Sequence, residues 1–99
     1  MFEINGKLFD WDDNKNQMNI NKHGVSFQEA ATVFSDTDAI EADDDEHSQH
    51  EDRFIIIGRS RRLRIVVVCH CFRESETVIR IISARMANKE EAKMYGGAE

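Results

Sequence analysis

The chain has 99 residues, of which 40% are apolar, a size and composition that fit one compact domain with a modest core. Its 13 basic and 19 acidic residues give a formal charge of −6, so any nucleic-acid-binding role depends on where the charges lie. No apolar run reaches the length of a membrane span, and the first residues lack the basic start and apolar stretch of a signal peptide, so we expect a cytoplasmic protein.

The first quarter of the chain predicts a hairpin and then a helix. Asn5-Gly6 is a strong signal for a two-residue turn between short strands within residues 2–9. Asp12 or Asp13 is placed to cap a helix that runs to about Lys22. Gly24 follows its end, where a left-handed residue is favoured.

A second helix is predicted from about residue 27 to residue 34. Ser26 precedes it and Glu29 follows three residues later, which is the pattern of a capping box. The apolar residues of this segment recur at helical spacing and should face the core. They are Phe27, Ala30, Ala31 and Phe34.

The charges of the following segments are strongly segregated. Residues 36–52 hold nine acidic residues and no Lys or Arg, whereas residues 53–93 hold ten basic and four acidic residues. The acidic segment is expected to be weakly structured, with one short strand at about residues 39–42. It is interpreted either as a solvated loop or as a segment that lies near the basic surface and competes with nucleic acid.

The second half predicts three strands, at about residues 53–58, 63–72 and 77–84, joined by short connections into an antiparallel meander. A short helix over residues 88–95 follows, with Asn88 as its cap and Gly96-Gly97 at its end. The expected fold is a single α+β domain, residues 1–99. It has a small antiparallel sheet of about four to five strands, two N-terminal helices and a C-terminal helix, with the helices on one face.

The last predicted strand and the residue after it carry two arginines, Arg80 and Arg85, whose guanidinium groups suit phosphate binding. Strict alternation would put them on opposite faces of the sheet. They can reach one site only if the strand ends or bulges near Ser83-Ala84, and an ending is expected. Cys69 and Cys71, on the preceding strand, should share a face as reduced thiols, because residues this close do not bridge comfortably.

Four stretches occur in a distinctive order along the chain. They are Phe9-Asp10-Trp11-Asp12 with Lys15; Asn19-Ile20-Asn21-Lys22-His23-Gly24-Val25-Ser26-Phe27 with Ala30 and Phe34; Glu51-Asp52-Arg53 with Ile57-Gly58; and Arg80-Ile81-Ile82-Ser83-Ala84-Arg85 with Glu90 or Glu91 and Tyr95. Together they resemble the BrnT family of toxins, whose fold is like that of the RelE ribonucleases.

The resemblance implies a type II toxin that cleaves RNA without a metal or other cofactor and inhibits translation. It also implies neutralisation by a BrnA-like ribbon-helix-helix antitoxin. The chain would contact operator DNA only through this antitoxin. Assembly as a homodimer or as a heterotetramer with the antitoxin is left open. The acidic insert motivates an alternative: a catalytically weak or inactive binding module that keeps the toxin fold in a repressor complex.

Metal-free RNA cleavage needs activation of the 2′-OH, stabilisation of the phosphorane charge and a proton for the leaving oxygen. Arg80 and Arg85 are the candidates for charge stabilisation. His70 and Glu51 are the candidates for proton transfer, His70 because it could lie on an exposed strand face and titrates near neutrality. Their structural alternatives are a half-buried histidine and an ion pair that holds Arg53.

Further basic and aromatic residues are candidates for RNA contact. Those at the tip of the predicted hairpin could grip the RNA backbone or an acidic antitoxin helix, or discourage aggregation at a sheet edge. Those on the last helix could close over the site, although helix packing is the alternative. The candidates are Arg53, Arg61, Arg62, Arg64, Lys93 and Tyr95.

A metal site is the weaker alternative chemistry. His47 and His50 stand in an acidic loop that could collect a divalent ion, but two histidines at this spacing without a firm scaffold are a weak signal. Cys69 and Cys71 with His70 between them would direct their side chains to two faces. The sequence therefore predicts no metal site.

Overall fold

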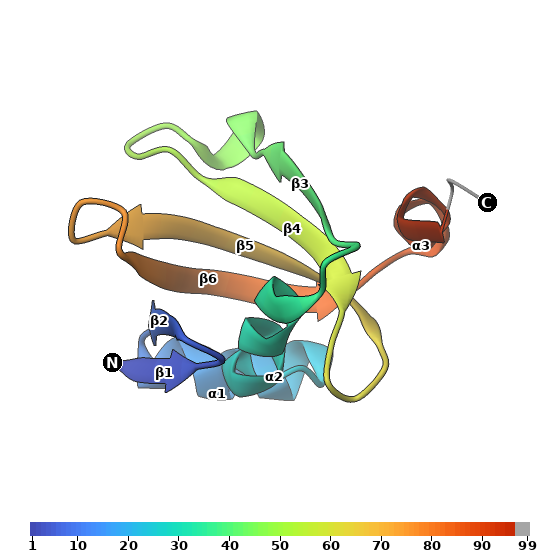
Figure 1. The fold of residues 1–99 in the computed structure, drawn as a ribbon, viewed down its shortest axis with the longest axis horizontal. Helices are drawn as coiled ribbons and strands as arrows, with labels where there is room; N and C mark the ends of the chain where they lie inside the picture. The colour runs from blue at the N-terminus through green and yellow to red at the C-terminus, as the bar shows by residue number, and fades with distance from the viewer. Residues whose placement is uncertain (97–99) are drawn as a thin grey trace.

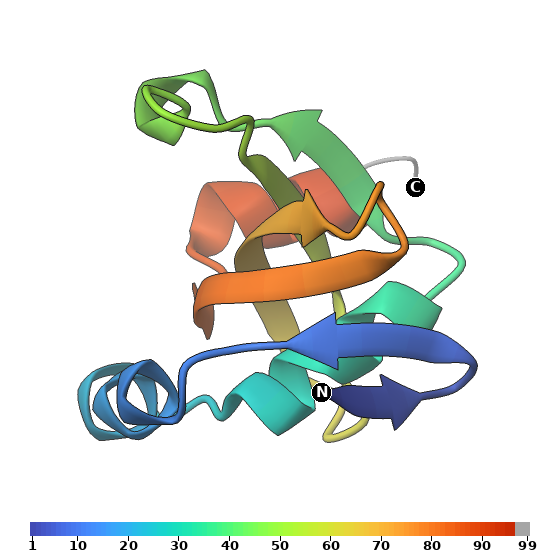
Figure 2. The same ribbon diagram turned by 90° about the vertical axis from the view of Figure 1, so that its left-hand side faces the viewer.

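The computed structural model describes residues 1–96 and shows a six-stranded mixed sheet in the order β1-β2-β6-β5-β4-β3 (Figures 1 and 2). The strands are β1 (Phe2–Ile4), β2 (Lys7–Asp10), β3 (Ile40–Asp43), β4 (Phe54–Arg59), β5 (Ile65–Arg73) and β6 (Val78–Met86). The helices are α1 (Asp13–His23), α2 (Phe27–Thr32) and α3 (Lys89–Gly96), with short 3-10 helices η1 (Val33–Ser35) and η2 (Asp45–His47).

The sheet combines the predicted antiparallel meander β4-β5-β6 with a parallel connection that was not predicted. The N-terminal hairpin turns at Asn5 and Gly6, whose φ angles of 52° and 82° suit a tight turn of this kind. Its second strand, β2, pairs in parallel with β6 over three residues. The sheet therefore has six strands rather than four to five, and the α+β class is confirmed.

Both N-terminal helices begin where the sequence predicts; α1 also ends as expected, whereas α2 ends at Thr32, two residues early, and continues as η1. The Asp12 side chain accepts a hydrogen bond from the Lys15 amide, and Gly24 ends α1 with a φ of 69°. Ser26 accepts from the amide of Glu29 as expected, but the Glu29 carboxylate turns into the interior instead of completing the capping box. This buried carboxylate becomes an anchor for the β4–β5 turn.

Helices α1 and α2 cover one face of the sheet and close the core against it (Figure 1). Phe9, Phe27, Val66, Val68 and Ile81 are among its buried side chains, each at most 1% exposed. The periodicity of α2 correctly predicts its buried side.

Helix α3 does not join α1 and α2 on their face, so the prediction that all helices gather on one face is wrong (Figure 1). Asn88 caps α3 as predicted by accepting from the Glu91 amide. The helix has no buried residue and approaches the sheet at β4. The predicted role of Gly97 lies outside the described residues. No helix within residues 1–96 is long and apolar enough to cross a membrane.

Candidate functional site

Strand β6 contains a β-bulge. Its pairing with β5 shifts between Cys69 and His70, and Ile82 is the extra residue without a partner opposite. The strand then continues to Met86. The expected strand ending near Ser83 is therefore wrong, and the bulge, the other arrangement considered, is present.

The bulge brings two arginines to the same face of the sheet. Arg80 lies opposite Cys71 and Arg85 lies opposite Val67, two positions that share a face of β5. This face points away from α1 and α2, because the neighbouring Val66 and Val68 belong to the core beneath those helices. We call it the arginine face, made by Arg53, Arg73, Arg80 and Arg85.

Asn19 of α1 holds β6 in place just after the bulge. Its side-chain amide donates to the carbonyl of Ala84 at 2.7 Å and to that of Val25 at 2.8 Å, and its oxygen accepts from the Ala84 amide at 3.1 Å. Strand β2 pairs with β6 only from Val78 to Arg80, so this part of β6 has no strand on that side. The buried amide of Asn19 thus takes the place of a neighbouring strand and positions Arg85 next to it.

The two arginines of β6 are each paired with a carboxylate. Arg85 makes two hydrogen bonds to Glu91, at 2.7 and 2.8 Å, and Arg80 donates to Asp10 at 2.6 Å. A bidentate carboxylate occupies the same donor fork that a phosphate would use. The geometry therefore shows both groups oriented for an oxyanion.

Glu51 performs the same role for the other two members of the arginine face. Arg73 donates to it at 2.9 Å, and the Arg53 guanidinium lies 3.8 Å away. The hydrogen bond from Arg73 lowers the pKa of Glu51, so this carboxyl is ionised at neutral pH. Its pairing with Arg53 agrees with the structural alternative considered for it.

A hollow of about 260 Å³ on this face contains a histidine that was not predicted as a site residue. His47 of η2 has its Nδ1 3.0 Å from both oxygens of Asp44. A carboxylate accepts hydrogen bonds, so this geometry fits donation from Nδ1, and Nε2 is the ring nitrogen that has no partner within residues 1–96. The Asp44 side chain is 8% exposed and that of His47 is 58% exposed. The residues around the hollow are Asp44, Glu46, His47, Arg53, Ile55, Val67, Cys69, Ile82, Ser83 and Arg85.

The sequence signal for this pair was Asp-x-x-His, three residues apart, within the acidic segment. That segment forms β3 as predicted and then η2. Asp44, Glu46 and Glu51 all lie at the arginine face, because they line its hollow or pair with its guanidinium groups. This supports the interpretation that acidic residues lie beside the basic surface and compete with phosphate there.

His70 lies elsewhere, and its predicted exposure is wrong. It is 1% exposed because the face that it shares with Val68 is the helix side of the sheet. Its ring packs against Phe34, Phe54 and Phe72, with centroid distances of 4.8, 6.1 and 5.6 Å. Burial lowers its pKa, so the ring is favoured in its neutral form. His70 therefore belongs to an aromatic cluster, away from the arginine face.

Arg64 is also engaged on the helix side. Its guanidinium group donates to both oxygens of the buried Glu29 and to the carbonyl of Gly24. Ser60 donates to the same carboxylate at 2.7 Å. These contacts join α1, α2 and the β4–β5 turn. The neighbouring Arg61 and Arg62 are exposed.

Tyr95 attaches α3 to the far side of β4. Its hydroxyl donates to Asp36 at 2.6 Å, and the Arg59 guanidinium lies 5.8 Å from its ring centre. With the Arg85–Glu91 pair, this gives α3 two polar attachments. Lys93 is exposed on the same helix. Helix packing, the alternative considered for Tyr95, is what the contacts show.

The potential metal ligands do not assemble. Within residues 1–96, no group of three or more His, Cys, Asp or Glu side chains is arranged to hold a metal ion. Cys69 and Cys71 are both free thiols. Burial raises the pKa of Cys69 to about 12, so this thiol is protonated at neutral pH.

Comparison with known proteins gives a consistent picture. The family model described as "Ribonuclease toxin, BrnT, of type II toxin-antitoxin system" matches residues 11–91. The chain is also similar to the 1.1 Å crystal structure of the Brucella abortus ribonuclease toxin BrnT. The two share 27% sequence identity and superpose with a TM-score of 0.63, over 84% of this chain and 99% of the other. No curated protein matches this chain.

Proposed function

The chain belongs to the BrnT family of ribonuclease toxins of type II toxin–antitoxin systems, and from this premise we propose that its arginine face binds the RNA phosphate at which cleavage occurs. The observation that supports this most directly is the bulge at Ile82, because it places Arg80 and Arg85 on one face. Two guanidinium groups there can stabilise the negative charge that develops on the phosphorane. The family match does not favour the alternative of an inactive binding module.

His47 is the proposed proton acceptor of this site. Its Nε2 would take the proton of the ribose 2′-OH, whose oxygen then attacks the neighbouring phosphorus. The bond from phosphorus to the 5′-oxygen breaks, and that oxygen takes a proton from solvent. The products are a 2′,3′-cyclic phosphate and a 5′-hydroxyl end. Asp44 orients the ring and stabilises its charged form, as carboxylates do beside catalytic histidines.

The other members of the arginine face are proposed to hold the flanking RNA backbone. Arg53 and Arg73 are already oriented by Glu51, for which we propose this positioning role in place of proton transfer. Arg61, Arg62 and Lys93 are exposed and available to contact more distant phosphates. Arg64 is not included, because its donors are used by Glu29 and Gly24.

The family assignment implies an antitoxin partner and an RNA substrate. We propose that this antitoxin is a BrnA-like ribbon-helix-helix protein and that the toxin reaches operator DNA only through it. The cleavage is proposed to need no metal, to inhibit translation and to take place in the cytoplasm. The free thiols agree with a reducing compartment.

The test is expression of the toxin without its antitoxin. We expect growth arrest with the natural sequence, and relief of the arrest by Arg85→Ala but not by Lys22→Ala, an exposed cation of α1 outside the residues proposed to contact RNA. Circular dichroism would confirm that both variants fold. Continued growth arrest with folded Arg85→Ala would contradict the proposed phosphate site.

Purified protein tests the proton acceptor and the metal. We expect His47→Ala to slow RNA cleavage by about 10²-fold or more, the usual contribution of acid–base catalysis. The exposed His50, three residues away, provides the matched control His50→Ala. Cleavage in the presence of EDTA and 5′-hydroxyl products would support the metal-free mechanism. Loss of activity in EDTA would refute it.

A further inference from the structure

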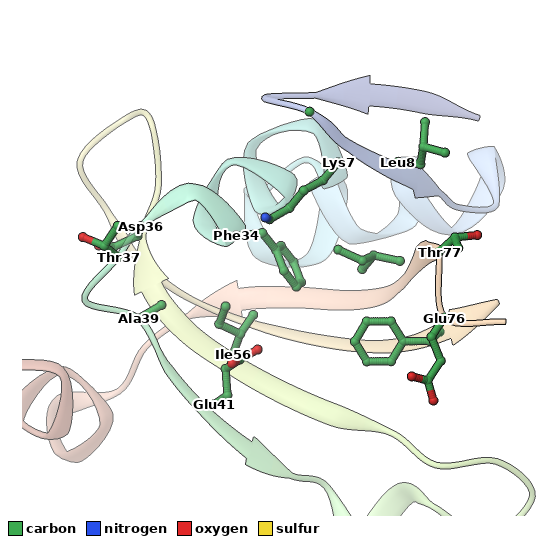
Figure 3. A pocket seen from close by; sticks show the side chains of 13 residues that line it. Lys7, Leu8, Phe34, Asp36, Thr37, Ala39, Glu41, Ile56, Glu76 and Thr77 are labelled. Carbon is green, nitrogen blue, oxygen red and sulfur yellow. The ribbon is translucent and has the colours of Figure 1, made fainter. Parts of the chain in front are cut away.

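A groove on the opposite side of the sheet from the arginine face has no role in the proposed cleavage. It encloses about 600 Å³ between the N-terminal hairpin and β3 (Figure 3). Helices α1 and α2 cover the neighbouring part of this sheet face but leave the groove open. Its apolar side chains include Phe34, Ile56, Phe72 and Ile79. Such an open apolar surface is typical of an interaction site.

One of these apolar side chains is notably exposed. Phe72 is 38% exposed, although it is large and apolar. It comes from β5, whereas Ile56 comes from β4 and Ile79 from β6, so the floor spans three neighbouring strands. The apolar surface therefore extends across the sheet and offers an extended contact to a partner.

The rim of the groove is acidic. Asp36, Glu41 and Glu76 line it, with Lys7 as the one cation among the lining residues. Figure 3 shows Asp36 and Glu76 at opposite ends, with the apolar side chains between them. Among residues 1–96, the carboxylates of Glu41 and Glu76 form no ion pair or hydrogen bond, whereas that of Asp36 accepts from the Arg59 amide and the Tyr95 hydroxyl. Two charges are thus free to meet a partner.

These charges discriminate between the possible occupants. RNA is disfavoured because its phosphates would meet carboxylates. A second copy of the chain would have to bring its basic surface to the groove, but Arg80 and Arg85 are already paired with carboxylates of their own chain. A contact between two different faces would also build rings or open chains rather than two-fold dimers. A protein segment with apolar and basic side chains fits both the floor and the rim.

We infer that this groove binds the antitoxin through an amphipathic segment that places apolar side chains on the floor and Lys or Arg beside Glu41 and Glu76. The inference rests on one part of the proposed function, namely that the chain acts as the toxin of a toxin–antitoxin pair. It deepens that function, because it puts the antitoxin anchor and the phosphate site on opposite faces of the sheet. Substitutions should therefore separate the two activities.

The first experiment measures the affinity of the purified toxin for the purified antitoxin encoded with it, by isothermal titration calorimetry. The test variant combines Glu41→Lys with Glu76→Lys. The control combines Asp13→Lys with Glu90→Lys, two exposed acids outside the groove, and changes the net charge equally. We expect the groove variant to bind at least tenfold more weakly and the control to bind within about threefold of the natural protein. Equal affinities of the groove and control variants would overturn the inference.

The second experiment tests the apolar floor with Phe72→Gln, matched by Met18→Gln on an exposed part of α1. Phe72→Gln should weaken antitoxin binding and reduce the rescue of growth by co-expressed antitoxin, whereas Met18→Gln should do neither. Ribonuclease activity is measured on the same samples. Retained cleavage with lost antitoxin binding supports the inference, and unchanged binding contradicts it. Failure of Arg85→Ala to relieve toxicity would count against the phosphate site alone.

Discussion

At the scale of single residues, three arginines of the arginine face, Arg73, Arg80 and Arg85, are hydrogen-bonded to carboxylates. Arg85 has the most complete pairing, because both its terminal nitrogens bond to Glu91. Such pairing orients the guanidinium but would compete with a bound phosphate. At the proposed phosphate site, RNA would therefore have to replace these carboxylates.

We expect Glu91→Gln to increase RNA affinity. A neutral amide keeps the shape of the side chain but gives up the ionic part of the Arg85 pair. A partly exposed pair contributes about 1 kcal/mol or less, so binding should tighten by up to about fivefold. Fluorescence anisotropy with an uncleavable 2′-O-methylated RNA measures this effect, with Glu90→Gln on the same helix as the control. Equal or weaker binding by Glu91→Gln would argue against competition.

At the scale of elements, α1 determines where the second half of β6 lies. The sequence marks Asn19 only as a polar residue within a helix. In the fold, it reaches across to both backbone groups of Ala84 and to the carbonyl of Val25. A buried strand edge needs partners for its N–H and C=O groups, and this one side chain supplies them.

Asn19→Leu should lower the free energy of unfolding by about 2–3 kcal/mol, because three buried hydrogen bonds are lost at about 1 kcal/mol each. Urea unfolding measures this loss. The control, Asn21→Leu, lies on the same helix but is exposed, and should change stability by less than about 0.5 kcal/mol. Equal effects of the two substitutions would show that Asn19 does not support β6.

At the scale of the whole molecule, ion pairs between acidic and basic residues connect different elements of the fold. Glu29 binds Arg64, Glu51 binds Arg73 and Glu91 binds Arg85. In each case the hydrogen bond from the arginine lowers the pKa of the carboxyl below its ordinary value of 4.5. The net charge of −6 therefore says little about function, because the charges act in local pairs.

These pairs predict a loss of stability in acid. Because these carboxyls have lower pKa values in the folded chain, the unfolded chain binds protons at a higher pH. The stabilisation from the ion pairs is therefore complete above about pH 4.5. It decreases as the pH falls through the folded pKa values. The urea midpoint should fall between pH 5 and pH 3. The decline should be shallower in Glu29→Gln, which has lost the most buried of these carboxyls. A midpoint that is constant over this range would contradict the prediction.

The sequence by itself determined the elements and their order, because turns, caps and apolar spacing are local signals. Asn5-Gly6, Gly24 and Asn88 each mark a boundary that the fold confirms. The two arginines of the last strand were also recognisable as candidate phosphate ligands. The sequence did not reveal whether these two arginines share a face of the sheet. That depends on a bulge, which arises from how β6 pairs with β5 and not from the residues of β6 alone.

Only the tertiary structure decided which histidine faces the site. His70 has the alternating pattern of an exposed residue, yet helices and aromatic rings cover its face of the sheet. His47 stands in an acidic segment with no periodicity, and its partner Asp44 becomes informative only once η2 folds against the arginine face. Long-range packing determines burial and the pairing of charges, so proton-transfer and phosphate-binding roles could be assigned to residues only after the chain was seen folded.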